Sequence, residues 1–356
     1  MTPHPRARTR PRHIAIIGGG MAGVACARTL DNAGCTVTLF EREPAWGGRT
    51  ASRDTPFGRF DAGAQYFTVR DPRFAQALET VPGLCRPWSA NAVRVLDPLG
   101  RVIEAARPGS PSHWVPRPGM DALVQAWAEP LAQAGRASTG LAVTGIEPDA
   151  LRPGGWQLRT LAGDGAVHVH AGFDAVLLAL PAPETRRLLA GLTTAAPLAE
   201  ALRPVAMAPC WTLMLAFPNA VQPGLSHLGP QWNAARSTHH RLAWLARESS
   251  KPGRGPVERW TVQAGAAWST EHRGDGADRV SAKLLKAFAE VTGIRATPAH
   301  VETQFWPYAR TEQPLGQSHL WDAAAGLGVC GDWCIGHRLE DAFVSGLSLA
   351  LDLVQG

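Results

Sequence analysis

The stretch His13-Ile-Ala-Ile-Ile-Gly18-Gly-Gly20-Met-Ala-Gly23 decides the fold of this 356-residue chain. The apolar run His13–Ile17 predicts a buried parallel strand, and a GxGxxG pattern follows it directly. The residues after Gly23 predict a helix over 24–33, and Thr36–Phe40 predicts a second strand. A strand, a glycine turn, a helix and a second strand within about 30 residues are typical of a βαβ unit that binds a dinucleotide. The predicted fold class is therefore α/β.

Each glycine of this motif has a physical purpose. Glycine is needed where the turn is tight, where the backbone approaches a pyrophosphate, and where helix meets strand. The helix N-terminus then offers free N–H groups to the phosphates. Glu41 follows the second strand, 18 residues after Gly23. Its carboxylate can accept hydrogen bonds from ribose hydroxyls, and it would repel a 2′-phosphate. The candidate nucleotide contacts here are Gly18, Gly20, Gly23, Glu41 and Arg42.

A second glycine turn narrows the choice of dinucleotide. It has the sequence Trp46-Gly47-Gly48-Arg49, and Phe60-Asp-Ala-Gly-Ala-Gln-Tyr-Phe67 follows it. Gly47 and Gly48 let the backbone approach a flat or charged ligand, and Arg49 can offer its planar fork to a phosphate or a carbonyl-rich ring. A turn of this kind after a dinucleotide-binding strand resembles the flavin-containing amine oxidase superfamily. The candidate flavin contacts here are Gly48, Arg49, Ala64 and Gln65.

The C-terminal segment predicts the other side of a flavin site. Residues 327–330 form a short predicted strand, and Gly331 and Asp332 follow. A carboxylate at this point can accept hydrogen bonds from the ribityl hydroxyls. A closing helix reaches Val354, and the partial positive charge at its N-terminus would stabilise negative charge on reduced flavin. The candidate contacts here are Gly331, Asp332, Glu340, Ala342 and Ser345.

The composition excludes several classes of protein. The net charge is +5, but four arginines lie within residues 1–12, and the rest of the chain has 31 basic and 30 acidic residues. We expect residues 1–12 to be a disordered basic leader. Nothing in the remainder demands nucleic-acid binding. No apolar run approaches the ~20 residues of a membrane span, so we expect a cytoplasmic protein without membrane contact. The histidines and the six cysteines lack metal-ligand spacing, and we predict no metal site.

Beyond these motifs, the chain resembles the bacterial renalase-like flavoproteins, a branch of the flavin amine oxidase superfamily. The resemblance covers nearly all of residues 13–354 and includes several distinctive stretches. They are Gly63-Ala-Gln-Tyr-Phe67 with Arg70-Asp-Pro-Arg-Phe74, Trp114-Val-Pro-Arg-Pro-Gly-Met120, Trp244-Leu-Ala-Arg247 with Ser250-Lys-Pro-Gly-Arg254, and Cys330-Gly-Asp-Trp-Cys334.

The resemblance implies non-covalent FAD in a discontinuous Rossmann-type domain like that of p-hydroxybenzoate hydroxylase. Val143 would lie where the backbone meets the adenine. A substrate domain built on an antiparallel sheet would complete the fold. We expect residues 13–72, 112–183 and 300–356 to form the FAD-binding domain, and 73–111 and 184–299 the substrate domain.

The resemblance also implies a reaction. Isomeric 2- and 6-dihydro forms of NAD(P) would give hydride to flavin N5, and O2 would reoxidise the flavin with release of H2O2. The lysine content favours such a donor independently. Amine oxidases of the superfamily use a lysine that holds a water against flavin N5, whereas the three lysines here lie between residues 251 and 286. A dihydropyridine needs no base because its product is already an aromatic cation.

The substrate side is predicted less firmly than the cofactor side. Gln65 and Tyr66 lie in the flavin-facing turn, and Trp306 and Tyr308 come shortly before the flavin segment, so these four are our candidate catalytic residues. Gln263 stands where relatives often have His, which leaves the substrate open. Oxidation of an amine, desaturation of another small molecule, and a non-catalytic flavin-binding redox sensor are the alternatives. The sequence does not decide the oligomeric state.

Overall fold

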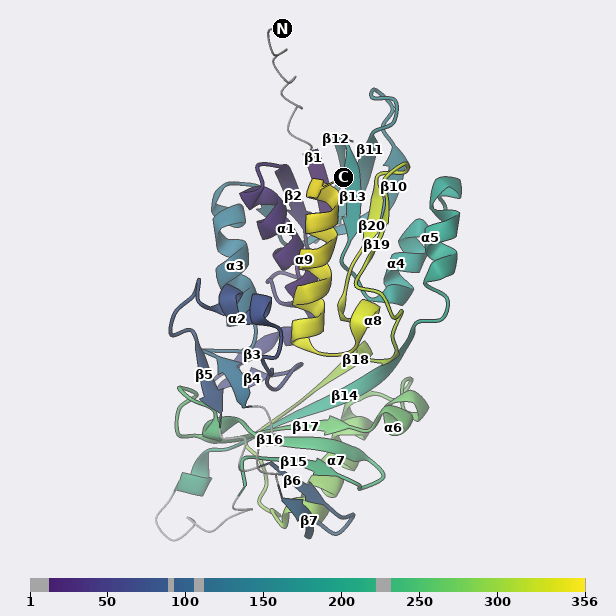
Figure 1. Ribbon diagram of the computed structural model, residues 1–356. Coiled ribbons are helices and arrows are strands. Elements are labelled where there is room, and N and C mark those ends of the chain that lie inside the picture. Colours follow the sequence, from purple (N-terminus) through teal and green to yellow (C-terminus); the bar gives the residue numbers. More distant parts are fainter. Residues whose placement is uncertain (1–12, 89–92, 106–111, 222–231, 356) are drawn as a thin grey trace, which may run out of the picture.

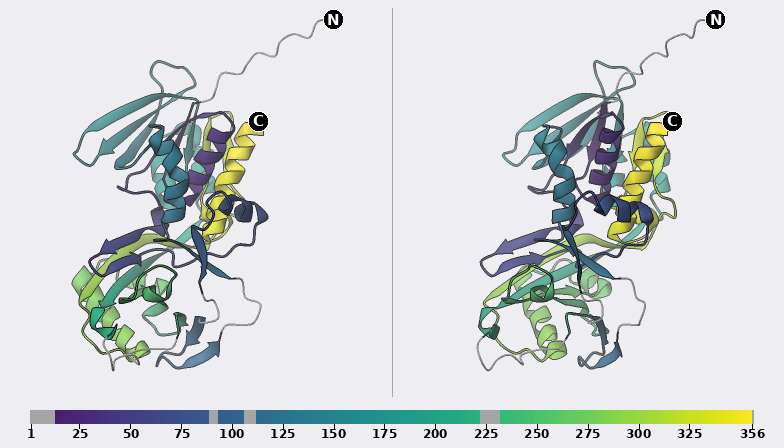
Figure 2. Two further views of the ribbon diagram at one scale, coloured as in Figure 1. Left: turned by 90° about the vertical axis from the view of Figure 1, so that its left-hand side faces the viewer. Right: turned by 60° about the vertical axis from the view of Figure 1, so that its left-hand side comes forward.

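The structure, a computed structural model, describes residues 13–88, 93–105, 112–221 and 232–355. The expected basic leader, residues 1–12, lies outside this part of the chain. Two regions are stacked on each other, and long strands run between them (Figures 1 and 2). One region is built on a mostly parallel sheet with helices, and the other on a mostly antiparallel sheet. This arrangement confirms the predicted α/β fold class with a sheet-rich second part.

The parallel sheet has β1 (His13–Ile17) near its centre, and every neighbouring pair is parallel except the pair at the β19 edge. In spatial order its strands are β19 (Leu320–Asp322), β20 (Leu327–Val329), β13 (Ala175–Leu178), β1, β2 (Thr36–Phe40) and β9 (Ala137–Ser138). The helices that pack on one face are α1 (Met21–Asn32), α3 (Ala122–Gln133) and α9 (Leu339–Gln355). The other face is covered by β10 (Leu141–Pro148), β11 (Trp156–Ala162), β12 (Val167–Phe173), α4 (Ala182–Leu189), η3 (Thr193–Ala195) and α5 (Ala196–Ala201).

Strand β1 is apolar throughout because both of its faces are covered. Ile14 and Ile16 join the core beneath α1, α3 and α9, whereas Ala15 and Ile17 join the core on the opposite face. Successive side chains of a strand point to opposite sides, so a continuous apolar run suits a strand buried on both faces. The helix predicted over 24–33 is present but begins at Met21, inside the glycine motif.

The second region is a seven-stranded sheet covered on one face by helices, and its neighbouring strands are antiparallel except for one parallel pair, residues 234–237 with 93–96. Its strands, in spatial order, are β18 (His300–Gln313), β14 (Ala206–Phe217), β17 (Glu258–Ala264), β16 (Leu242–Arg247), β15 (Ala234–Ser237), β6 (Val93–Leu96) and β7 (Val102–Ala105). The helices and short 3₁₀ turns of this region are η4 (Pro218–Val221), η5 (Glu248–Ser250), α6 (Ala266–Glu271) and α7 (Ala277–Thr292).

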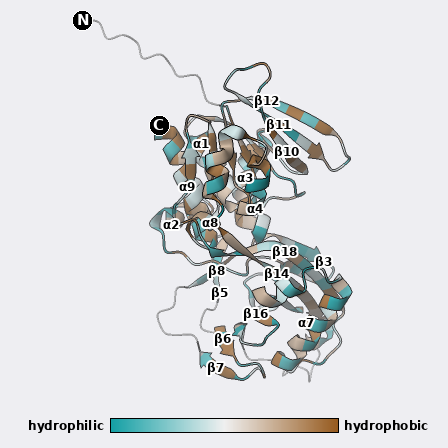
Figure 3. Cartoon of the chain, turned by 90° about the vertical axis from the view of Figure 1, so that its right-hand side faces the viewer, coloured by the Kyte–Doolittle hydropathy of each residue, from teal (hydrophilic) through white to brown (hydrophobic). Residues whose placement is uncertain are grey.

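Alternation along these strands separates two environments. In β17, Trp260, Val262 and Ala264 join the apolar core under α7. The residues between them, Thr261 and Gln263, therefore face the opposite way. Figure 3 shows that α7 also has both hydrophobic and hydrophilic residues, and its apolar side packs on the sheet.

Smaller elements join the two regions. The hairpin of β3 (Ser52–Thr55) and β4 (Gly58–Asp61) packs on the seven-stranded sheet, because Phe60 and Ala62 share a small core with Met214 and Ala216. The other connecting elements are η1 (Gly48–Thr50), α2 (Pro72–Leu78), β5 (Cys85–Trp88), which pairs with β8 (His113–Pro116), and α8 (Asp332–Ile335).

Three predicted domain boundaries need correction. β18 hydrogen-bonds to β14 along most of its length, so residues 300–313 belong to the antiparallel sheet and not to the FAD-binding domain. The helices α4 and α5, expected in the substrate domain, pack in the core against the parallel sheet. Phe74 of α2 likewise packs with Phe343 of α9. Sequence order misled the prediction because each segment pairs with a partner far away in the chain.

None of the helices within the described ranges is long and apolar enough to cross a membrane.

Helices α1 and α9 pack so closely that one position of α9 has no room for a side chain. A Cβ at Gly346 of α9 would collide with the carbonyl oxygen of Ala22 in α1. We predict that Gly346→Ala lowers the free energy of unfolding by about 1–3 kcal/mol, the usual cost of overpacking, although alanine is the better helix former. Urea unfolding measures this. Gly274→Ala is the matched control, because nothing lies within 4 Å of a Cβ there. Equal stability of both variants would contradict the close packing.

Candidate functional site

The first glycine turn leaves open space beside the start of α1. Gly18 has a φ of 111°, and a Cβ there would lie 2.6 Å from the Ala179 carbonyl oxygen. A Cβ at Gly23 would collide with the Gly18 carbonyl, so this glycine permits close packing of helix on strand. At Gly20, in contrast, no atom lies within 4 Å of a Cβ. The motif therefore combines two tight positions with one open position, beside the unpaired N–H groups of a helix N-terminus.

Glu41 lies against this turn. Its side chain is buried, with Oε2 2.6 Å from the Gly19 N–H and Oε1 2.8 Å from the Glu43 N–H, and both N–H groups donate to it. Burial raises the pKa of Glu41, and the two backbone hydrogen bonds oppose that rise. The carboxylate is thus held against the glycine turn by two backbone N–H groups.

The neighbouring candidates differ in their surroundings. The Arg42 guanidinium lies 3.2 Å from Glu184, and its side chain is 55% exposed. It also donates to Glu43, and its contact with the cofactor stays a prediction. Val143 lies on β10, which begins where the Leu141 N–H donates to the Glu41 carbonyl at 2.9 Å.

The second glycine turn packs directly on the first. The Gly47 N–H donates to the Gly19 carbonyl at 3.0 Å, and a Cβ at Gly48 would lie 3.3 Å from the Gly20 Cα. Gly48 has a φ of 54°, which favours glycine. These contacts explain why both turns are glycine-rich and why their spacing was informative in the sequence.

Arg49 and Asp332 meet although 283 residues separate them. The guanidinium contacts both carboxylate oxygens, with Nη1 3.0 Å from Oδ2, and this is the two-pronged geometry typical of arginine and carboxylate. Asp332 is buried, and the Thr311 hydroxyl donates to Oδ2 at 3.3 Å. Two predicted flavin contacts are therefore part of one polar cluster.

The C-terminal candidates divide into two groups. The Gly331 N–H donates to the Ser345 hydroxyl at 2.9 Å, and Ala342 is buried on the same helix α9. Glu340 has protein partners in the structure. Its Oε1 accepts the backbone N–H groups of Arg70 and Asp71, both at 2.6 Å. It anchors the segment before α2, and its contact with the flavin stays a prediction.

The turn over residues 63–66 is tightly fixed. The Ala64 N–H donates to the Arg49 carbonyl at 2.9 Å, and a Cβ at Gly63 would collide with that same carbonyl. Gln65 is 5% exposed, and its Nε2 donates to the Gly63 carbonyl at 3.0 Å. Gln263 of β17 donates to that carbonyl from the other side, at 2.8 Å. The residue that departs from the pattern of relatives thus touches the predicted flavin-facing turn.

Tyr66 belongs to an aromatic group that the sequence did not indicate. Its ring stacks on His113 at 3.8 Å between centroids, and the ring of Trp244 lies 5.5 Å away. Within the described residues, His113 Nδ1 and Trp244 Nε1 are buried without a hydrogen-bond partner. Burial, aided by Arg236, lowers the pKa of His113 to about 4. The neighbouring rings belong to Trp88 of β5, His113 of β8 and Trp244 of β16. Because these strands are far apart in the sequence, no local spacing predicts the group.

Trp306 and Tyr308 are separated by one residue on β18 and have different surroundings. Trp306 Nε1 donates to the Ala62 carbonyl at 3.0 Å, and its ring lies 3.5 Å from the position of a Cβ at Gly63. It therefore borders the turn. Tyr308 accepts a hydrogen bond from Arg187 of α4 at 3.4 Å. This contact joins the Tyr308 hydroxyl to α4.

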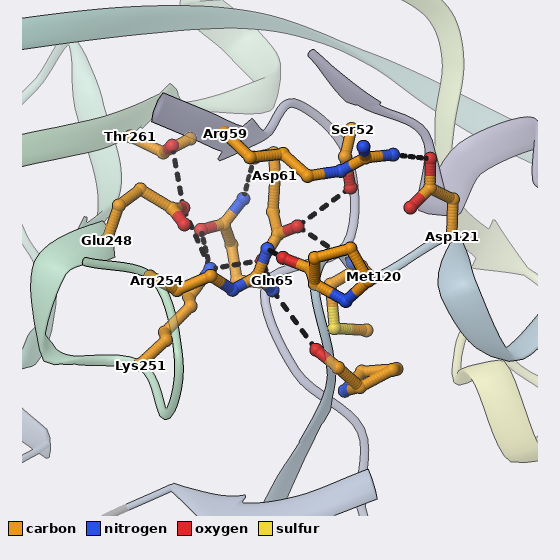
Figure 4. Close-up of polar contacts among 12 residues, drawn as sticks. Ser52, Arg59, Asp61, Gln65, Met120, Asp121, Glu248, Lys251, Arg254 and Thr261 are labelled. Carbon is orange, nitrogen blue, oxygen red and sulfur yellow. Dashed lines mark hydrogen bonds and ion pairs between the residues drawn. The ribbon is translucent and has the colours of Figure 1, made fainter. Parts of the chain in front are cut away.

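A buried ionic cluster beneath the turn was also missed (Figure 4). Asp61, Glu248, Lys251 and Arg254 converge there, and Lys251 Nζ donates to Gln65 Oε1 at 3.1 Å. Sequence reasoning placed the lysines away from the flavin position, but one of them lies a single hydrogen bond from a predicted flavin contact. The distinctive stretch Ser250–Arg254 was the available signal, and its role depends on tertiary contacts.

These residues fit a bound FAD. The open position at Gly20 would leave room for the pyrophosphate, Glu41 would offer a carboxylate to the adenosine ribose, and Asp332 would do the same for the ribityl chain.

Family comparison agrees with this geometry. Residues 16–81 match the model of the NAD(P)-binding Rossmann-like domain, and residues 104–354 match that of the flavin-containing amine oxidoreductases. The second match covers more than half of the chain, so the chain belongs to the flavin-containing amine oxidoreductase family. The sequence predictions of this superfamily, of FAD as cofactor and of an FAD-dependent oxidoreductase are thereby confirmed.

Curated relatives match over short segments. Hydroxyneurosporene desaturase of Cereibacter sphaeroides is 41% identical over 58 residues, which are 16% of this chain and 12% of that protein. Phytoene dehydrogenase of Streptomyces griseus is 39% identical over 59 residues, 17% of this chain and 12% of that protein. The chain thus spans about an eighth of each relative's length.

Solved structures match over the whole chain. A candidate protoporphyrinogen oxidase from Exiguobacterium sp. 255-15 has a TM-score of 0.74 and 15% identity, covering 97% of this chain and 99% of its own. Cyclohexylamine oxidase from Brevibacterium oxydans has a TM-score of 0.70 and 12% identity with the same coverage. At these identities the likeness supports the fold alone.

Replacement of the Glu41 carboxylate tests its assigned role. We predict that Glu41→Gln weakens FAD binding about tenfold, because a charge-assisted acceptor at the glycine turn is lost. Dilution of the FAD-loaded protein with flavin fluorescence as readout measures the affinity. Glu43→Gln is the matched control, since the Glu43 side chain is 60% exposed. Unchanged FAD affinity in Glu41→Gln would contradict the role.

The environment of His113 predicts a pH dependence of stability. The folded protein keeps this imidazole neutral down to about pH 4, whereas the unfolded chain protonates it near its ordinary pKa of 6.5. The unfolded state therefore binds more protons in this window, and stability falls as the pH is lowered from 6.5 toward 4. In His113→Phe, which keeps an aromatic ring against Tyr66, urea unfolding at pH 7 and pH 5 will give a smaller difference than in the wild type. Equal differences would refute the prediction.

Proposed function

We propose that this protein is a renalase-like oxidase of isomeric dihydronicotinamides. The substrates would be the 2- and 6-dihydro forms of NAD(P), and the products NAD(P)+ and H2O2. FAD supplies the acceptor for the hydride at N5 and then passes the two electrons to O2. The family resemblance of the chain supports this proposal. The main observation in its favour is that all three lysines are paired with carboxylates.

All three lysines have carboxylate partners. Lys251 uses its three donors on Asp61 Oδ2 at 2.8 Å, Glu248 Oε1 at 2.8 Å and Gln65 Oε1 at 3.1 Å. Lys283 and Lys286 lie on α7, beside Asp275 at 3.2 Å and Glu290 at 4.0 Å. An ammonium group has three N–H donors, so Lys251 has none left to hold a water against the flavin.

This lack of a free lysine favours a donor that needs no deprotonation. An amine must lose a proton to become a good hydride donor, and a neighbouring base or bound water assists that step. A dihydropyridine loses hydride directly because aromaticity drives the reaction. His113, with a pKa of about 4, is a poor proton acceptor at neutral pH.

The remaining residues suit a flat ring. Trp306 presents its indole beside Gly63, and Gln65 and Gln263 hold the carbonyl of that residue. In the proposed complex these groups fix the turn while Trp306 and Tyr66 border the nicotinamide with aromatic surface. Tight positioning of the hydride donor would then provide much of the rate acceleration.

Anaerobic rapid mixing tests the proposal. With 6-dihydro-NAD the visible absorption of the flavin should disappear within about a second, in keeping with common turnover rates. Admission of O2 should restore it and yield one H2O2 per substrate. Cyclohexylamine and an L-amino acid serve as comparison donors. Bleaching by an amine and not by 6-dihydro-NAD would establish the amine oxidase alternative, and no bleaching by any donor would favour a redox sensor.

A further inference from the structure

The loop Ser250–Arg254 carries a cationic pair into the interior of the protein. It follows η5 and contains Lys251 and Arg254, whose side chains have no solvent exposure. Asp61 of β4 accepts from Lys251 Nζ at 2.8 Å and from Arg254 Nη2 at 2.7 Å. Glu248 Oε1 lies 2.8 Å from the same Nζ. Figure 4 shows these four side chains converging from opposite sides.

Burying four charged side chains has a large desolvation cost in free energy. This cost indicates that the cluster has a role beyond stabilising the fold. Desolvation of two ion pairs offsets most of their attraction, and apolar replacements in other cores are often neutral or stabilising. Burial raises the pKa of Glu248, whose Oε2 has no hydrogen-bond partner in the described part of the chain. In Asp61 the effect of burial is outweighed by Lys251 and Arg254, which keep its pKa below the ordinary value. The cluster is thus held together by its cations.

Lys251 contacts one predicted catalytic residue, Gln65, and the ring of Trp88, which lies near Tyr66. Its Nζ donates to Gln65 Oε1 at 3.1 Å and lies 5.4 Å from the ring centre of Trp88. Trp88 donates from Nε1 to Ser250 Oγ at 3.0 Å, and its ring centre is 6.4 Å from that of Tyr66. One cation therefore supports both Gln65 and, through Trp88, Tyr66.

The contact also sets the orientation of the Gln65 amide. Its Nε2 donates to the Asp61 carbonyl at 2.5 Å and to the Gly63 carbonyl at 3.0 Å. The opposite end, Oε1, faces an ammonium group that can only donate. A flipped amide would place N–H groups against Nζ and an oxygen against two carbonyls. Lys251 thereby enforces the orientation in which Gln65 holds the Gly63 carbonyl.

We propose that Lys251 is a positioning residue for the flavin-facing turn over residues 63–66 and acts through the side-chain amide of Gln65. The loop Ser250–Arg254 would then link the antiparallel sheet to the flavin environment. This inference rests on FAD as cofactor and is independent of the dihydronicotinamide substrate, so failure of the substrate proposal leaves it standing.

A double-mutant cycle on the FAD-loaded protein tests the inference. The variants are Lys251→Met, Gln65→Met and their combination, with Lys286→Met as control because that side chain is 71% exposed. The readouts are the FAD dissociation constant, the visible spectrum and the midpoint potential of the bound flavin. We expect each single change to weaken FAD binding about tenfold, the loss of one charge-assisted hydrogen bond, and to shift spectrum and potential in the same direction.

The combination distinguishes positioning from mere stability. If Lys251 acts through Gln65, adding Lys251→Met to Gln65→Met changes the flavin readouts little further. Full additivity, or a Lys251→Met protein with normal spectrum, potential and FAD affinity, would overturn the proposal. Should Lys251→Met fail to fold, Glu248→Gln with Lys251→Met removes one charge of each sign and repeats the comparison. A normal flavin spectrum and affinity in that variant would equally reject the role.

Discussion

The carboxylate of Asp61 accepts hydrogen bonds from four groups that belong to separate parts of the chain. Ser52 and Met120 hold Oδ1, and Lys251 and Arg254 hold Oδ2. Through these contacts the β3–β4 hairpin, the segment before α3 and the loop after η5 meet at one buried point. A carboxylate without solvent exposure requires such partners, because an unpaired buried charge is strongly destabilising. The arrangement of the two sheets around the predicted flavin-facing turn depends on this junction.

From Asp61 the fixed geometry extends in two directions. Toward the nucleotide, Ala62 and Ala64 donate to the carbonyls of Ala51 and Arg49, which places the turn beside the Arg49–Asp332 pair. Toward the antiparallel sheet, the turn meets Gln263 and Trp306. The predicted cofactor side and substrate side thus share one rigid backbone segment, and a shift at either side would be transmitted to the other.

The glycine motifs show how much local sequence could predict. The positions of Gly18, Gly20 and Gly23 report backbone constraints, and backbone constraints are local, so the βαβ unit was recognisable without tertiary information. The domain boundary at residue 300 failed because the pairing of β18 with β14 joins segments about 90 residues apart.

Sequence alone determined the dinucleotide-binding unit, because its glycine spacing follows from backbone geometry. The resemblance of further motifs to a known superfamily implied the FAD cofactor. Tertiary structure decided which side chains meet. It gave Glu340 and Arg42 partners within the protein, assembled Tyr66 with His113 and Trp244, and brought Lys251 to Gln65. Those pairs are separated by tens to hundreds of residues, and no local pattern specifies which distant segments share a buried surface. Hence the sequence motifs suffice to predict the cofactor, whereas the side chains that surround the flavin-facing turn are specified only by the tertiary structure.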